Sequence, residues 1–253
     1  MKKRVSGWIG MVALAAALAG CGTPPPAAPD IAASPWGQAA LGPARAASVR
    51  PSWTHYPLPG KTPTRFHYER ADGREAILAT AQSAASMLRR PLRVEPAALG
   101  SVRFSWKVPE LIAEADLARR DRADSPVRVI LAFEGDRSRL SDRERITGEL
   151  VRTLTGEEMP YATLMYVWCN QRAAGSVIRS PRSDRIRKLV VESGERNLNR
   201  WLDYERDIRA DYLLAFGEEP GALVGIAIMT DSDNTRTTAR AWYGPLRLTA
   251  GRR

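Results

Sequence analysis

Oxygen-bearing side chains gather near the end of the chain, in the run Asp231, Ser232, Asp233 and Asn234. Alternating oxygen ligands on a loop suit Ca²⁺, a hard cation that takes about six to eight oxygens. The helix–loop–helix calcium motif fails here, because Arg236 stands where that motif needs glycine. Asp and Asn also form turns between strands, and the sequence favours a turn over a metal site.

Aromatic residues offer a second kind of chemistry, the stacking of a side chain on a sugar ring. An aromatic face covers the apolar face of the sugar, while nearby polar groups bond the hydroxyls. Trp106 and Trp168 lie in strand-like runs. Large aromatics in strands are also the usual core of a β-sandwich, so burial is the competing interpretation. The predicted ligand contacts are Trp106, Trp168, Asn170, Arg182, Asp231, Asp233 and Asn234.

Carboxylates at helical spacing suggest a third possibility, the hydrolysis of a glycosidic bond between two acids. Asp203, Asp207 and Asp211 follow one another at intervals of four residues. Carboxylates beside an arginine such as Arg206 more often form exposed ion pairs. A hydrolase that uses Asp207 or Asp231 is therefore the alternative hypothesis.

The familiar catalytic sets are missing from the sequence. His55 and His67 are its two histidines, and there is no zinc, phosphate-loop or serine-hydrolase motif. Cys169 ends an apolar strand-like run, which predicts a small buried residue rather than a nucleophile. We assign no catalytic residue, no metal and no cofactor.

The chain is basic, with 38 Lys and Arg against 28 Asp and Glu and a formal net charge of +10. A positive excess can indicate a nucleic-acid partner. Here the basic residues are interspersed with acids, and no nucleic-acid-binding motif accompanies them. We therefore expect no nucleic-acid partner.

The first 20 residues have the pattern of a secretory signal. Basic residues at 2–4 precede the apolar stretch 8–19 and then Cys21. The apolar stretch is shorter than the roughly 20 residues that a membrane-spanning helix needs. The ending Leu-Ala-Gly-Cys resembles the lipobox of bacterial lipoproteins. That resemblance implies a lipid on Cys21 as the first mature residue, and Gly22 in place of Asp implies the periplasmic face of the outer membrane.

Positioning any site requires a folded domain, and the composition changes where that domain should begin. Residues 21–60 are rich in Pro and Ala, which predicts a tether, with Trp36, Trp53 and Tyr56 as candidates to dock on the domain. Residues 61–250 are predicted to form one domain. Asp72-Gly73 indicates a hairpin, and we interpret the ambiguous stretch 75–89 as strands.

Two helices are predicted between the strands. Ser141 and Glu144 form a capping box, Ile146, Leu150 and Leu154 lie at helical spacing, and Gly156 fits the position after the helix. A second helix is predicted from Trp201 to Ala215. About nine strands with two short helices in the connections indicate a mainly-β sandwich.

Several blocks together resemble a bacterial envelope family known as domain of unknown function 3047. They are Phe104 to Val108, Tyr161 to Trp168, Asp184 to Lys188 and Met229 to Thr235. The family brings no established activity, and its pattern is similar to jelly-roll carbohydrate-binding modules of the galactose-binding type. The resemblance implies a jelly-roll sandwich over residues 64–248.

The leading hypothesis is a lipid-anchored, non-catalytic binding module facing the periplasm. Its ligand would be an envelope glycan or another envelope component. The alternatives are the carboxylate-dependent hydrolase and a structural lipoprotein that binds a protein partner through an exposed apolar patch.

Overall fold

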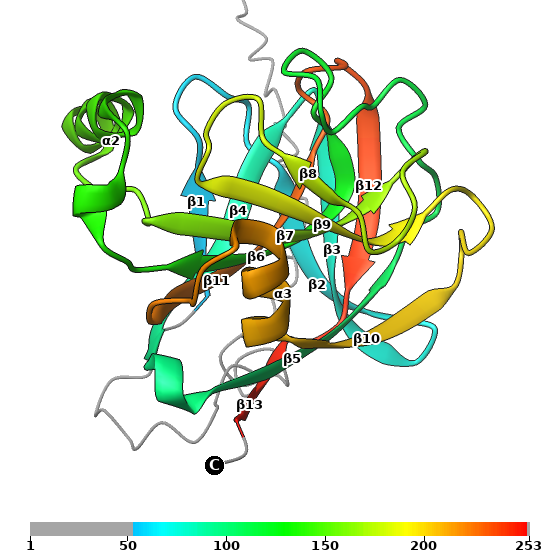
Figure 1. Ribbon diagram of the computed structural model, residues 1–253. Helices are drawn as coiled ribbons and strands as arrows, with labels where there is room; N and C mark the ends of the chain where they lie inside the picture. The colour runs from blue at the N-terminus through cyan, green and yellow to red at the C-terminus, as the bar shows by residue number, and fades with distance from the viewer. Residues whose placement is uncertain (1–52, 252–253) are drawn as a thin grey trace, which may run out of the picture.

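A computed structural model of the chain describes residues 53–251 (Figure 1). The predicted signal, Cys21, Trp36 and most of the predicted tether lie outside the described residues. Within 53–251 the chain forms thirteen strands, more than the number predicted, and two α-helices. The strands are β1 (Thr54–Pro57), β2 (Arg65–Ala71), β3 (Arg74–Gln82), β4 (Ala85–Val94), β5 (Leu99–Lys107), β6 (Ser125–Phe133), β7 (Ala162–Cys169), β8 (Val177–Arg179), β9 (Ile186–Ser193), β10 (Trp201–Asp207), β11 (Leu223–Asp231), β12 (Thr238–Tyr243) and β13 (Arg247–Ala250).

The strands form two sheets that pack face to face. One sheet has the order β1-β4-β11-β6-β7-β9-β8, and the other has the order β10-β5-β12-β3-β2, with β13 paired to β5. Neighbouring strands are antiparallel except β7 and β9, which run parallel. The predicted mainly-β sandwich is confirmed, and its arrangement is consistent with a jelly-roll.

Side chains that alternate along the strands fill the space between the sheets. Phe104 of β5 stacks on Tyr166 of β7, with ring centroids 5.4 Å apart, and on Tyr204 of β10 at 5.3 Å. Trp106 and Trp168 belong to the same buried cluster. The Phe104–Tyr166 contact joins the two sheets, and the Phe104–Tyr204 contact lies within the six-stranded sheet.

The predicted hairpin and the strand interpretation of residues 75–89 are both confirmed. Asp72 and Gly73 have positive φ values of 51° and 77°, as a two-residue turn that follows the twist of the strands requires. The turn joins β2 to β3, and the next reversal leads into β4. Cys169 is also buried, as predicted.

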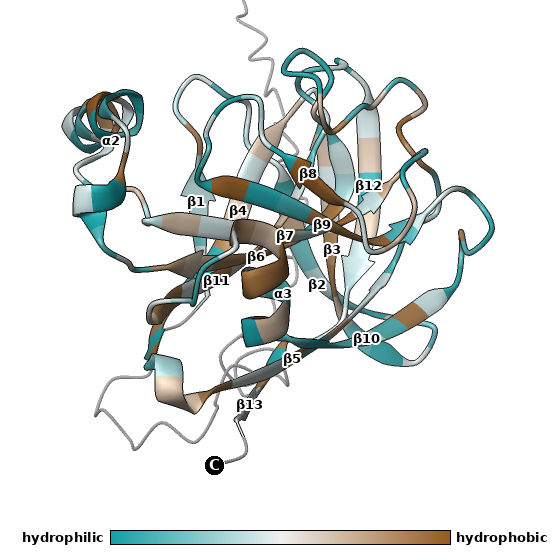
Figure 2. Ribbon diagram, viewed as in Figure 1, coloured by the Kyte–Doolittle hydropathy of each residue, from teal (hydrophilic) through white to brown (hydrophobic). Residues whose placement is uncertain are grey.

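The first predicted helix is present as α2 (Asp142–Thr155), but its apolar residues face solvent. The Ser141 hydroxyl accepts the backbone N–H of Glu144, and Gly156 ends the helix with a φ of 73°. Ile146, Leu150 and Leu154 are 70%, 58% and 67% exposed. Figures 1 and 2 show α2 standing away from the two sheets.

The second predicted helix begins later than expected. Residues Trp201–Asp207 form the strand β10, and the helix α3 spans Ile208–Phe216. The Asp207 side chain caps this helix by accepting the backbone N–H of Ala210. The aromatic spacing fits a helix, but the alternating residues 201–207 pair with β5 along their whole length, and this pairing satisfies the backbone of the strand.

The folded region extends further toward the N-terminus than predicted. Trp53 is buried and Thr54–Pro57 form the edge strand β1, so the boundary at residue 60 is several residues too late. The predicted docking of Trp53 and Tyr56 on the domain is confirmed, since the first is in the core and the second is in β1. Among residues 53–251, no helix combines the length and apolar character needed to cross a membrane.

Candidate functional site

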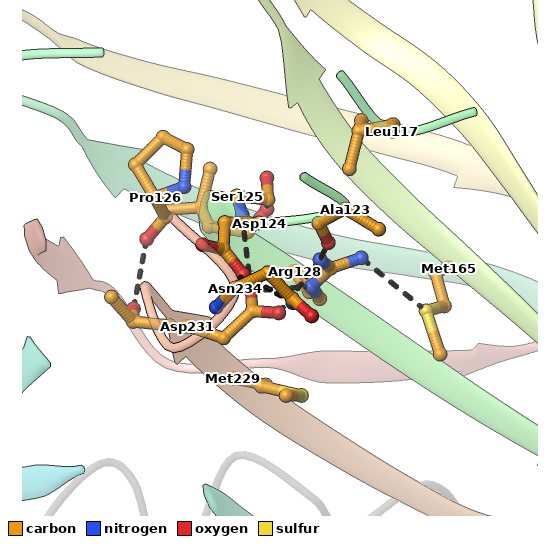
Figure 3. Close-up of polar contacts among 12 residues, drawn as sticks. Leu117, Ala123, Asp124, Ser125, Pro126, Arg128, Met165, Met229, Asp231 and Asn234 are labelled. Carbon is orange, nitrogen blue, oxygen red and sulfur yellow. Dashed lines mark hydrogen bonds and ion pairs between the residues drawn. The ribbon is translucent and has the colours of Figure 1, made fainter. Parts of the chain in front are cut away.

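A buried ion pair lies on the outer face of the seven-stranded sheet (Figure 3). Arg128 of β6 and Asp231 at the end of β11 are 3% and 4% exposed. The Arg128 Nε and Nη2 donate to the two carboxylate oxygens of Asp231 at 2.8 and 2.9 Å. The backbone N–H of Ser125 also donates to Asp231, at 3.1 Å. Burial raises the pKa of Asp231, while the Arg128 guanidinium acts in the opposite direction.

Asp124 holds the loop that follows Asp231. Its carboxylate accepts the Asn234 side-chain amide at 2.6 Å, and the backbone N–H and hydroxyl of Thr235, each at 2.7 Å. Asp124 is 1% exposed, so these hydrogen bonds compensate its carboxylate for the loss of hydration on burial. The predicted turn at 231–234 is therefore a fixed loop, clamped by an aspartate that the sequence analysis did not identify.

A half-open cleft of about 140 Å³ lies beside this ion pair. It exceeds the space for one ordered water, which is on the order of 10–15 Å³. Its polar lining includes Lys61, Arg182, Lys188, Asp233 and Asn234, in addition to Arg128 and Asp231. Leu58, Ala85, Met165, Ile186 and Met229 supply its apolar part. The cleft thus combines four basic side chains, two carboxylates and an apolar surface.

The rim of the cleft is formed by side chains from distant segments. The Arg182 Nη2 donates to the Asn234 Oδ1 at 2.8 Å and to the backbone oxygen of Arg120 at 3.2 Å. Lys61 forms an ion pair with Asp233. Arg182, Asp231, Asp233 and Asn234, all predicted as ligand contacts, are therefore brought together.

Lys188 of β9 is a buried lysine in the lining of the cleft. It is 4% exposed, and its Nζ donates to the backbone oxygen of Leu117 at 2.6 Å. Burial, with the neighbouring charge of Arg128, lowers the pKa of Lys188 to about 7. The pKa of Lys188 therefore lies near neutral pH, and an anion bound close to this amine would favour its charged form.

The predicted aromatic platform is wrong. Trp106 and Trp168 are 0% and 1% exposed and pack between the sheets, and the Trp168 indole N–H donates to the backbone oxygen of Gly194 at 2.9 Å. Neither ring can stack on a ligand, because both strands turn these positions inward. Burial, the competing interpretation, is the correct one.

Asn170 lies outside the cleft lining. Its side-chain amide donates to the backbone oxygens of Ile112, at 2.7 Å, and of Ala113 and Ala115, each at 3.3 Å. It therefore anchors the loop 109–124 over the sheet. This is a correction to its prediction as a direct ligand contact, because its donor group is occupied by the protein.

The predicted row of helical carboxylates does not form. Asp203 lies on β10, where it pairs with Arg74 at 2.8 Å, and Asp207 caps α3. Asp211 is buried and accepts from Arg206 at 2.5 Å and from the Tyr166 hydroxyl at 3.0 Å. Asp203 lies within β10, Asp207 ends this strand and caps α3, and Asp211 lies within α3; because the three are not on one helix and each is bonded within the protein, they present no shared catalytic face.

Three carboxylates approach one another beside the cleft. Oxygens of Asp124, Asp231 and Asp233 lie within 4.8 Å of one another. Asp231 is paired with Arg128, Asp233 with Lys61, and Asp124 with the 234–235 segment. The protein's own donors therefore occupy this cluster, and we assign no metal to it.

Two comparisons bear on the identity of the chain. No curated protein matches it. The model of a family described as protein of unknown function (DUF3047) matches residues 51–247, which include both sheets except the last few residues of β13, together with the cleft. This match covers most of the sequence and agrees with the resemblance in the four sequence blocks. The chain belongs to the DUF3047 family.

Proposed function

We propose that this protein is an exported lipoprotein, anchored through Cys21 at the periplasmic face of the outer membrane, that binds an anionic envelope glycan without turning it over. The observation that supports the binding role is the cleft, where Lys61, Arg128, Arg182 and Lys188 outnumber Asp231 and Asp233. An excess of positive charge in a partly enclosed site favours anions.

The mixed lining of the cleft supports a sugar acid as the ligand class. Met165 and Met229 offer apolar surface to the C–H face of a sugar ring, and Ser180 and Asn234 offer groups that bond hydroxyls. Arg182 is exposed, and its guanidinium can bond a carboxylate in a bidentate manner. A uronic acid unit carries all three kinds of group.

The state of the carboxylates supports binding rather than hydrolysis. A glycoside hydrolase needs two carboxyl groups available on either side of the bond. Asp231 is locked to Arg128, and Asp207 caps a helix. Neither carboxylate named in the hydrolase hypothesis is available to exchange protons with a substrate.

The test of the binding role is titration calorimetry with galacturonic acid oligosaccharides, using neutral galactose oligosaccharides for comparison. We expect the acidic sugars alone to bind. Arg182→Ala removes a charge-assisted bond of about 1.5–3 kcal/mol and should weaken binding about 10- to 100-fold. Arg247→Ala, an exposed arginine on the other sheet, is the matched control. If the two variants bind the acidic sugars with equal affinity, the cleft is not the binding site.

The anchor is tested separately, by the mass of the purified chain. Acylation at Cys21 predicts a mature protein that begins at this residue and carries lipid, and Cys21→Ala should release the protein into the soluble fraction. A chain that keeps residues 1–20, or that carries no lipid, would refute the anchor while leaving the glycan test intact.

A further inference from the structure

The helix α2 has its apolar and polar sides reversed relative to an ordinary surface helix. Ile146, Leu150 and Leu154 are spaced four residues apart, so they form one stripe along the helix, and all three are exposed. No residue of α2 is buried. An amphipathic helix normally turns such a stripe toward the core of its domain. The stripe of α2 faces away from the domain instead, so it is available to contact another molecule or a surface.

Polar groups hold the opposite side of α2 to the domain. The Glu144 carboxylate accepts the Ser183 hydroxyl at 2.9 Å and the Asp184 backbone N–H at 2.8 Å. The cavity beside the helix is lined from α2 by Glu144, Arg145, Gly148, Glu149 and Arg152, and by none of the three stripe residues. The orientation of α2 is therefore fixed by its polar side.

The exposed stripe also carries a free positive charge. Arg143 lies three residues before Ile146, on the same side of the helix. It is exposed, and its guanidinium makes no hydrogen bond or ion pair with any other residue among those described. Arg145 and Arg152, by contrast, pair with Asp142 and Glu149. An arginine beside an apolar stripe matches the phosphate and acyl boundary of a bilayer.

The N-terminal segment enters the domain beside α2. Thr54 of β1 pairs with Arg89 of β4, and the Arg89 guanidinium bonds both carboxylate oxygens of Glu157 at 2.5 Å. Glu157 follows α2 by two residues. A lipid at Cys21 would therefore pull on the domain close to the end of this helix.

The size of the stripe favours a bilayer over a protein partner. The stripe and Arg143 amount to four residues, whereas a stable protein interface takes roughly 20–30 residues from each partner. A bilayer needs no such number of residues, because membrane attachment commonly combines two weak signals. A lipid anchor would also keep the helix at a high local concentration near the membrane.

We propose that α2 is a membrane-docking helix, which inserts Ile146, Leu150 and Leu154 into the headgroup–acyl boundary while Arg143 contacts lipid phosphate. This inference rests on the proposed lipid anchor. It gives the domain a defined orientation on the membrane, set by the anchor and the helix together.

The test places an environment-sensitive fluorophore on the full mature chain, bound to vesicles of phosphatidylethanolamine and phosphatidylglycerol. Leu150→Cys carries the probe on the stripe, and Arg152→Cys carries it on the opposite side of the same helix. Cys169 is buried and should react slowly. We expect a blue shift and quenching by spin-labelled lipid at position 150 and neither change at position 152. Ile146→Asp should abolish the shift.

A second arm separates this inference from the anchor. The same two labelled chains are held on nickel-chelating vesicles by a hexahistidine in place of Cys21, so the test does not depend on acylation. Identical spectra at positions 150 and 152 in this arm would overturn the docking helix, even if the natural chain proves to be acylated. A shift at position 150 that depends on protein concentration without vesicles would indicate a second copy instead, and would also overturn it.

Discussion

Lys188 should make the stability of this protein rise with pH across the neutral and mildly alkaline range. Burial lowers its pKa from 10.5 to about 7 in the folded chain. At about 1.4 kcal/mol for each pKa unit, this shift corresponds to about 5 kcal/mol of differential stability. The value is of the same order as the whole stability of many domains.

The sign follows from proton binding. Between about pH 7 and 10.5 the unfolded chain keeps a proton on this lysine that the folded chain has released. The free energy of unfolding therefore increases with pH, by up to about 1.4 kcal/mol per unit, and the full penalty is present below pH 7. Burial also raises the pKa of Tyr166, Tyr204, Tyr212 and Tyr243, which reverses the trend above about pH 10.

The perturbation is Lys188→Met, which keeps the length of the side chain and removes its charge. The variant leaves the Leu117 carbonyl without its donor, at a cost of about 1–3 kcal/mol, but it no longer buries an ammonium. We expect it to be more stable than the natural protein by a few kcal/mol at pH 6, and to lose this advantage toward pH 10.

The assay is urea denaturation at intervals from pH 6 to 9.5. The control is Lys107→Met, the same chemical change at a lysine whose ammonium pairs with the exposed Asp72 at 2.8 Å, and it should keep the natural slope. Parallel curves for the natural protein and Lys188→Met would refute the reasoning, since they would show that the buried ammonium does not set the pH dependence.

Four further substitutions test the buried ion pair, α2 and the close approach of Gly221 to Glu134. Arg128→Met leaves Asp231 buried and unpaired and should lower the free energy of unfolding by about 3–5 kcal/mol; adding Asp231→Leu should recover much of this loss in the same denaturation assay. Gly148→Ala in α2 meets no atom within 4 Å and should stabilise the chain by about 0.5–1 kcal/mol, seen as a higher Tm. Gly221→Ala places its Cβ 2.1 Å from the Glu134 carbonyl oxygen, and a Tm equal to that of the natural protein would contradict that close approach.

The parts of the fold that the sequence predicts are those set by neighbours in the chain. Asp72-Gly73 indicates a hairpin because its turn needs positive φ at adjacent residues, and Ser141 and Gly156 mark the ends of α2 through caps. The sequence does not predict the start of α3, because the aromatic spacing at 201–208 fits a helix. The residues of β5 that pair with β10 lie about 100 positions earlier in the chain. Long-range pairing overrides local periodicity there.

The residues of the candidate site also divide into those that the sequence predicts and those that it does not. Asp231, Asp233 and Asn234 stand out because polar residues cluster on one loop. Arg128 is a single charge within the apolar strand β6, whereas Lys188 follows Arg187 near the start of β9, and the partners of both lie on other segments. A lone charge inside a strand-like apolar run is itself a signal, because a buried charge needs a partner; that signal could have identified Arg128, but not Lys188.

Amphipathic patterns specify which residues share a face, but they do not specify what covers that face. Trp106 and Trp168 lie in strands whose pattern fits either a ligand platform or a core, and the second sheet covers them. Ile146, Leu150 and Leu154 form an equally regular stripe, and no described element covers it. The difference arises from Glu144, whose bonds to Ser183 and Asp184 turn the helix outward. Glu144→Ala should therefore release the orientation of α2 without unfolding the sandwich, and faster hydrogen exchange confined to residues 142–155 would show it.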